Sequence, residues 1–176
     1  MKGIVFTEFF ELVEKEFGYQ MVDTIISKSD LESEGVYTSV GTYPHSEIVQ
    51  LIVNLSKETG IQVDQLLYLF GKYLFNTFLS AYPQFFENFS NSFEFLSSID
   101  DYIHVEVKKL YPDATLPEFS THIDTSTMTM IYKSERSMSA LALGLIEKTI
   151  EHYNEELTVQ KELLSDDGSL VKFIIQ

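Results

Sequence analysis

The sequence contains no cysteine and no tryptophan. Without cysteine the chain can form no disulfide bond, no thiolate zinc site, no iron–sulfur cluster and no cysteine nucleophile. Any metal that the protein binds must therefore be held by histidine, carboxylate or tyrosine side chains.

Basic residues are also scarce. Twelve Lys and Arg stand against 27 Asp and Glu, and the formal net charge is -15 at pH 7. Such a chain repels phosphate backbones and anionic lipid surfaces, so we expect it to bind neither nucleic acid nor membranes. The apolar stretch Ala140 to Ile146 is too short to span a bilayer, and Glu8 and Glu11 interrupt the start of the chain before a signal peptide could form. We expect a cytoplasmic protein.

The sequence patterns of the common catalytic sites are missing. The four histidines are His45, His104, His122 and His152, and no two of them have the four-residue spacing of a helical zinc site. HExxH, the GxSxG turn of serine hydrolases, the P-loop and the dinucleotide fingerprint do not occur. We therefore expect that the protein is not an enzyme.

Apolar and aromatic residues are abundant. Hydrophobic residues make up 44% of the chain, which has 14 Phe and 10 Tyr. A chain of 176 residues can bury a core of its own, so we expect a single domain spanning residues 1–176. The aromatic side chains either line a pocket or fill the core, and filling the core is the commoner use.

The first part of the chain has the periodicity of helices. Apolar residues recur at helical spacing, and Gly18, Gly60 and Pro83 mark helix ends. Ser98 with an acid three residues later predicts a further helix start, and that helix ends at Tyr111 before a proline. The helices expected before it cover residues 6–17, 20–27, 47–59 and 63–78.

The second part alternates between strand and helix patterns. Residues 127–132 are rich in alternating β-branched and aromatic residues and predict a strand, and a helix is expected from about Ser139 to Glu156. The end of the chain, 157–164 and 170–175, reads as a hairpin. The sequence predicts an α+β fold, in which a helical N-terminal half is followed by a small antiparallel sheet with an inserted helix.

His104 differs from the other histidines in its setting. It lies in the middle of a predicted helix, near the edge of its apolar face, where a buried imidazole needs a partner. Taken alone, a core histidine bonded to a backbone carbonyl, or one that reaches solvent, is the commoner interpretation.

A second pattern is Tyr132-Lys133-Ser134-Glu135-Arg136. In an extended strand alternate residues share a face, so Tyr132, Ser134 and Arg136 would span roughly 13 Å on one side. Arg provides a bidentate charged donor and the hydroxyls add directed hydrogen bonds, which suits the two carboxylates of a heme in an apolar cleft. A solvated strand face is the alternative.

These residues resemble the H-NOX (heme nitric oxide/oxygen binding) family, whose hallmark is a proximal histidine followed by Tyr-x-Ser-x-Arg. The resemblance covers essentially the whole chain. Its further segments are Met1-Lys2-Gly3-Ile4, Ser56-Lys57-Glu58-Thr59-Gly60, Phe70-Gly71-Lys72-Tyr73, Ile103-His104-Val105-Glu106-Val107 and Gly144-Leu145-Ile146.

The resemblance implies heme b (iron protoporphyrin IX) as cofactor, buried between the helical half and the sheet. It implies that His104 is the axial iron ligand, that Tyr132, Ser134 and Arg136 hold the propionates, and that Pro117 presses on the porphyrin. The side chains that it implies around the distal face are Val5, Phe9, Leu74, Phe78, Leu141 and Leu145.

None of these distal side chains donates a hydrogen bond. Family members that hold oxygen carry a tyrosine at the position matching Leu141, and that departure implies selectivity for nitric oxide, with carbon monoxide as a further ligand. Bound oxygen gains from a donor, whereas ferrous nitrosyl needs little such help.

The resemblance also implies a signalling mechanism. Nitric oxide binds ferrous iron opposite His104 and weakens or breaks the bond to it, which frees the helix and shifts the N-terminal helices against the C-terminal half. Since no effector domain follows Gln176, we expect output in trans, to a histidine kinase or a diguanylate cyclase. A peroxidase would need distal acid and base groups, which the distal set lacks.

A lipid or fatty-acid carrier is the alternative function. Its acyl chain would occupy the apolar cleft, and Tyr132 and Arg136 would bind the carboxylate. Only the heme hypothesis predicts a Soret band.

Overall fold

The computed structural model describes residues 1–176 and has an α+β fold. In chain order its elements are α1 (Gly3–Phe17), α2 (Tyr19–Ser27), α3 (His45–Thr59), α4 (Val63–Ala81), the 3-10 turn η1 (Pro83–Phe85), α5 (Ser92–Ser97), the π-helical turn η2 (Ile99–Ile103), α6 (His104–Leu110), β1 (Glu118–Asp124), β2 (Thr127–Lys133), α7 (Ser139–His152), β3 (Val159–Leu163) and β4 (Leu170–Ile175). None of the helices combines the length and the hydrophobicity that a membrane span requires.

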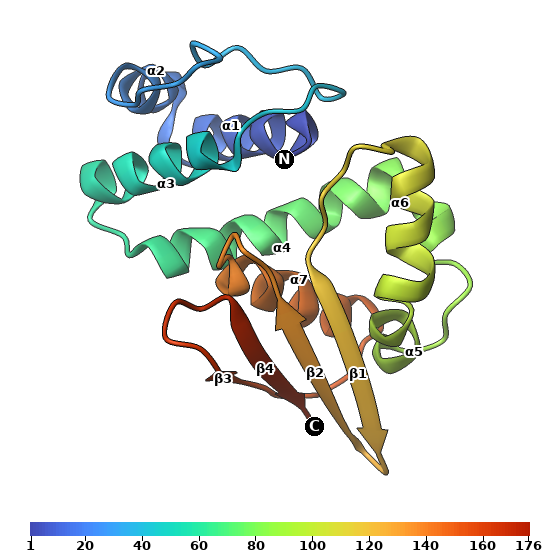
Figure 1. The fold of residues 1–176 in the computed structure, drawn as a ribbon. Helices are drawn as coiled ribbons and strands as arrows, with labels where there is room; N and C mark the ends of the chain where they lie inside the picture. The colour runs from blue at the N-terminus through green and yellow to red at the C-terminus, as the bar shows by residue number, and fades with distance from the viewer.

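Helices α1, α2 and α3 form an N-terminal lobe, residues 1–60, above the rest of the molecule (Figure 1). α1 presents Phe6, Phe9 and Val13 at helical spacing, and all three are almost completely buried. Gly18 ends this helix with a φ of 83°, a conformation that glycine adopts without strain. The apolar core of the lobe continues onto one face of α4.

Helices α4 and α7 cross in direct backbone contact below the lobe. A Cβ atom added at Gly71 would lie 2.2 Å from the carbonyl oxygen of Leu141, and one added at Gly144 would lie 2.2 Å from the carbonyl oxygen of Tyr68. Only glycine permits so close an approach. The two helices therefore form one rigid pair, and Figure 1 shows α4 running between the lobe and α7.

The sheet has four antiparallel strands in the order β1-β2-β4-β3. One face is buried against α7 through alternate residues, among them Met130 on β2 and Phe173 on β4. α7 is inserted in the chain between β2 and β3. This arrangement confirms the predicted helical half, small antiparallel sheet and inserted helix.

The helix predicted from Ser98 to Tyr111 is present as η2 and α6, but the Ser98 side chain does not cap it. Its Oγ donates to the carbonyl oxygen of Phe95 at 2.7 Å, whereas the side chain of Asn91 caps α5 by accepting from the N–H of Glu94 at 2.9 Å. One predicted helix boundary is wrong. α7 ends at His152 rather than Glu156, since the left-handed φ of 56° at Asn154 turns the chain.

Candidate functional site

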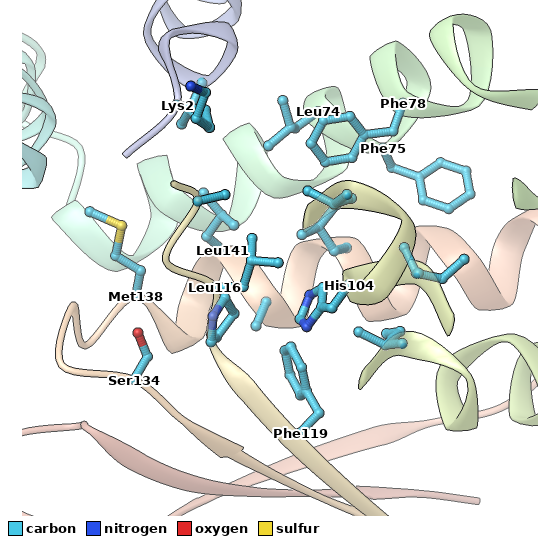
Figure 2. Close-up of a pocket in the computed structure, with 18 of the residues that line it drawn as sticks. Lys2, Leu74, Phe75, Phe78, His104, Leu116, Phe119, Ser134, Met138 and Leu141 are labelled. Carbon is cyan, nitrogen blue, oxygen red and sulfur yellow. The ribbon is translucent and has the colours of Figure 1, made fainter. Parts of the chain in front are cut away.

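An apolar cavity of about 300 Å³ lies between the two halves of the molecule. Of its 33 lining residues 26 are hydrophobic. The lining comes from the start of α1, from α4, η1, α5, η2 and α6, from the segment 111–117, from β1 and β2, and from α7. Figure 2 shows the His104 ring among these side chains, with Phe119 on one side and Leu74 and Phe78 of α4 on the other. A cavity of this composition suits a largely apolar ligand.

His104 is fixed by a carboxylate one helical turn earlier. Its Nδ1 lies 2.8 Å from Oδ1 of Asp100, and Oδ2 of Asp100 accepts the backbone N–H of Phe119 at 2.9 Å. A carboxylate at this distance keeps the imidazole proton on Nδ1, so Nε2 has a free lone pair. Burial is the largest cause that lowers the pKa of His104, against the opposing effect of Asp100. The neutral ring is the form that binds metals.

The π-helical turn η2 places this pair. The carbonyl oxygen of Ser98 accepts from the N–H groups of both Tyr102 and Ile103, so the helix is widened just before His104. π turns of this kind occur often at functional sites. Asp100 and His104 then lie four residues apart on one face.

Tyr132, Ser134 and Arg136 all line the cavity, but not as one extended strand. β2 ends at Lys133, and the N–H of Arg136 donates to Oγ of Ser134 at 3.3 Å in the turn that follows. The extended geometry predicted for these three residues is therefore wrong. The hydroxyl of Tyr132 accepts from the N–H of Met138 at 3.1 Å, so the backbone of the turn holds it in place.

The guanidinium of Arg136 reaches across the cavity mouth. It donates to the carbonyl oxygen of Thr115 at 2.7 Å and makes no ion pair. Burial lowers the pKa of this group. A half-buried guanidinium with no carboxylate partner is a ready site for an anion.

Five of the six predicted distal residues line the cavity, as does Pro117. They are Val5 on α1, Leu74 and Phe78 on α4, and Leu141 and Leu145 on α7. Phe9 does not reach the cavity. It is one turn further along α1 than Val5 and packs against Phe70 in the core of the lobe, with ring centroids 5.4 Å apart.

The sequence did not identify three polar residues of the site: Tyr82 and Tyr111, which line the cavity, and Asp100, which bonds His104. Asp100 could have been found as the acid one turn before His104. The hydroxyls of Tyr82 and Tyr111 both belong to the lining and lie 3.3 Å apart, and this bond, with burial, raises the pKa of Tyr82 to about 12. No local pattern marks that pair, because its members are far apart in the sequence.

The donor set excludes a metal ion held by protein ligands alone. No group of three or more histidine, cysteine or acidic side chains is placed to bind a metal. One imidazole with a free Nε2 suffices for a cofactor that brings its own in-plane ligands, such as a metalloporphyrin. The apolar walls suit the ring and the Arg136 rim suits carboxylates, so the residues present fit a heme.

The fold and the cavity thus define a class: an α+β protein with an apolar pocket and a single imidazole inside it. The model of the Haem-NO-binding (HNOB) family matches residues 2–161, and the chain belongs to this family, whose members bind heme. No curated protein matches the chain.

Solved H-NOX structures agree with this assignment. The Fe(II) unliganded A71G mutant from K. algicida is 50% identical, with a TM-score of 0.97 over 99% of this chain and 95% of that chain. The Fe(II) unliganded H-NOX protein of the same organism, without that substitution, is 49% identical, with a TM-score of 0.96 over 99% and 95% of the two chains. The IWP-051-bound H-NOX from Shewanella woodyi in the Fe(II)CO state is 41% identical, with a TM-score of 0.84 over 99% of this chain and 93% of that chain.

Proposed function

We propose that this protein is a heme-based gas sensor that binds heme b through His104 and takes nitric oxide or carbon monoxide on the opposite side. The observation that carries this proposal is the Asp100–His104 pair, which fixes Nε2 as a free ligand in an apolar cavity. Membership of a heme-binding family supports it, and so does the Fe(II)CO state of the relative from Shewanella woodyi.

When bound, the heme supplies an iron atom that coordinates one imidazole and one diatomic gas. The side chains at the cavity mouth hold its carboxylates: Arg136 contributes the charge, and Tyr132 and Ser134 contribute hydroxyls. Arg136 then shares or releases its bond to the carbonyl of Thr115. Pro117 lies in the same wall and would press on the ring.

The distal wall selects among gases because it lacks a hydrogen-bond donor. Leu74, Phe78, Leu141 and Leu145, with Val5, offer no hydrogen-bond donor, and a polarised oxygen ligand gains most from one. Two tyrosine hydroxyls of the lining, Tyr82 and Tyr111, lie 3.3 Å apart, so one of them donates to the other. We therefore propose that nitric oxide and carbon monoxide bind and that oxygen does not.

Signalling follows from the way in which His104 is tied to the fold. Asp100 joins His104 to the backbone of Phe119, at the start of β1, so a change in the position of the ring pulls on both α6 and the sheet. We propose that release of His104 shifts the N-terminal lobe, and that a histidine kinase or a diguanylate cyclase reads this shift in trans in the cytoplasm. The protein itself catalyses no reaction.

The absorption spectrum of the protein reconstituted with heme tests the proposal. We expect a Soret band that shifts when nitric oxide or carbon monoxide is added to the reduced protein. Absence of the band, with tight binding of a fatty acid instead, would replace the sensor by a lipid carrier, an alternative that the comparisons do not support.

A further inference from the structure

Three polar side chains from two distant parts of the chain form a closed triangle beside the cavity. Nζ of Lys2 donates to Oγ1 of Thr42 at 2.7 Å and to Oδ1 of Asp113 at 3.3 Å. Oγ1 of Thr42 donates to Oδ2 of the same carboxylate at 2.6 Å. The ammonium of Lys2 also lies 5.0 Å from the ring centroid of Tyr111, and the Lys2 side chain is only 12% exposed.

This triangle is the one polar connection between the lobe and the distant half of the chain. Every hydrogen bond and ion pair that joins residues 1–61 to residues 82–176 ends on the carboxylate of Asp113. Apart from the contact of the Lys2 ammonium with the Tyr111 ring, the lobe meets this half through apolar contacts with Met138 and the first turns of α7. Apolar surfaces slide at low cost, whereas a charge-assisted triangle fixes one position.

Asp113 lies in the segment that connects the His104 helix to the sheet. Residues 111–117 run from the end of α6 to β1, and most of them line the cavity. The segment has a second anchor, the bond from Arg136 to the carbonyl of Thr115. In Figure 1 the start of α1 faces this connection between α6 and β1. The triangle therefore closes the cavity where the lobe meets the His104 side.

We propose that Lys2, Thr42 and Asp113 form a latch that holds the N-terminal lobe closed over the cofactor and couples the lobe to the His104 helix. This inference rests on the proposed function and deepens it, because it names the contact through which movement of α6 reaches the lobe. Asp113 acts as a positioning residue and does not touch the cofactor.

Isolated ion pairs on a surface contribute little, so the geometry of this contact matters. Asp113 is 57% exposed, but both of its oxygens are engaged, by two donors that also bond each other. The bond from Thr42, followed by that from Lys2, holds the pKa of the Asp113 carboxyl below its usual range. The latch is thus fully charged at neutral pH.

The test compares heme release from Asp113→Ala with release from Asp23→Ala. Asp23 is an exposed acid of α2 with no bonded partner, so it controls for the loss of one negative charge. With a scavenger protein in excess, we expect Asp113→Ala to release heme about 3- to 10-fold faster than wild type, and Asp23→Ala to match wild type. Equal rates in the two variants would overturn the latch.

Two further variants separate a latch from a general loss of stability. Thr42→Val keeps the shape of the side chain and deletes the bond from Thr42 to the Asp113 carboxylate. Combining Thr42→Val with Asp113→Ala should therefore not increase the rate of heme release further. Exchanging the charges, with Lys2→Asp and Asp113→Lys together, should restore slow release. Additive effects, or no rescue, would contradict the proposal.

Amide hydrogen exchange distinguishes failure of the latch from failure of the proposed function. The N–H groups of Gly3 and Ile4 donate to the carbonyls of Gly41 and Ser39, close to the latch. In the protein as purified these amides should exchange faster in Asp113→Ala than in Asp23→Ala. If the chain takes up no heme, the proposed function fails, and unchanged exchange would then overturn the latch independently.

Discussion

The N-terminal lobe and the half that bears the sheet are held together in different ways. Ladders of backbone hydrogen bonds tie the strands of the sheet to one another. α7 packs on the sheet through buried apolar residues and meets α4 in backbone contact at Gly144. The lobe rests on this frame through apolar contacts, the bond from Thr77 of α4 to Glu8, and the carboxylate of Asp113. We therefore expect the frame to be the rigid partner and the lobe to be the movable cover of the cavity.

The cavity takes its walls from both regions. His104, Tyr132 and Leu141 belong to the frame side, whereas Val5 is carried by the lobe. We expect substitutions on the frame side to decide whether the cofactor is held at all. Substitutions where the lobe and the frame meet should instead change how fast the cofactor is released and which gas the bound cofactor takes.

The largest expected effect comes from removing His104, the proposed ligand of the heme iron. His104→Ala should abolish the Soret band of the reconstituted protein, or leave a band that needs added imidazole, because no other histidine lines the cavity. His122→Ala, on the exposed side of β1, is the matched control and should keep the wild-type spectrum. An unchanged ferrous spectrum in His104→Ala would remove His104 as the ligand.

Gly144→Ala should break the frame itself. The added Cβ meets the carbonyl oxygen of Tyr68 at 2.2 Å, so α4 and α7 must separate, and we expect a loss of about 3 kcal/mol in the free energy of unfolding. Gly18→Ala is the control, since its Cβ meets nothing within 4 Å and only the positive φ costs about 1 kcal/mol. Urea unfolding measures both, and equal losses would show that the helix crossing adapts.

Local periodicity explains why most helices could be predicted. α1 to α4 each bury one face at helical spacing, and Gly18 and Gly60 mark ends that the structure confirms. The sequence does not predict β1. Most residues of this strand are polar, and its apolar Ile123 is exposed, so no alternation of buried apolar and exposed polar residues marks it.

The functional groups were easier to predict than their geometry. The sequence identified His104 and the residues from Tyr132 to Arg136, but not that β2 ends at Lys133 or that Ser137 turns the chain with a φ of 51°. Serine is a weak turn signal, so the end of the strand is decided by tertiary contacts.

Contacts between distant segments left no sequence pattern at all. The latch joins positions 2, 42 and 113, and Phe9 lies in the core because the lobe packs on α4 there. The roles of the cavity residues toward heme remain predictions.

Arg136→Ala should loosen the boundary without destroying the site. Loss of the guanidinium removes the charged partner of the heme carboxylates, and we expect release to a scavenger protein about tenfold faster. Lys133→Ala, three residues earlier, removes a cation that pairs with Glu118 outside the cavity and should leave the rate unchanged. Equal rates for all three proteins would mean that the carboxylates lie elsewhere.

Leu141→Tyr is expected to have the smallest net effect, because two opposing energies nearly cancel. A phenol on α7 places a donor in a wall that has none, and a hydrogen bond to a polarised oxygen ligand is worth roughly 1.5 to 3 kcal/mol, about 10- to 150-fold in affinity. Leu141 also packs close to the α4–α7 crossing at Gly71, where a larger ring costs about 1 to 3 kcal/mol.

The net gain in oxygen affinity of Leu141→Tyr is therefore at most about 30-fold and close to none at the middle of both ranges, and a Leu74→Ala background should increase it by making room for the ring. Leu141→Phe, in the same background, adds the ring without the hydroxyl and isolates the hydrogen bond. Spectra of the reduced proteins in air measure the effect, and wild type should show no stable oxygen complex. Stable oxygen binding by wild type would refute the hypothesis that the missing hydrogen-bond donor excludes oxygen. If tyrosine and phenylalanine behave alike in both backgrounds, the side chain at position 141 does not face the bound gas.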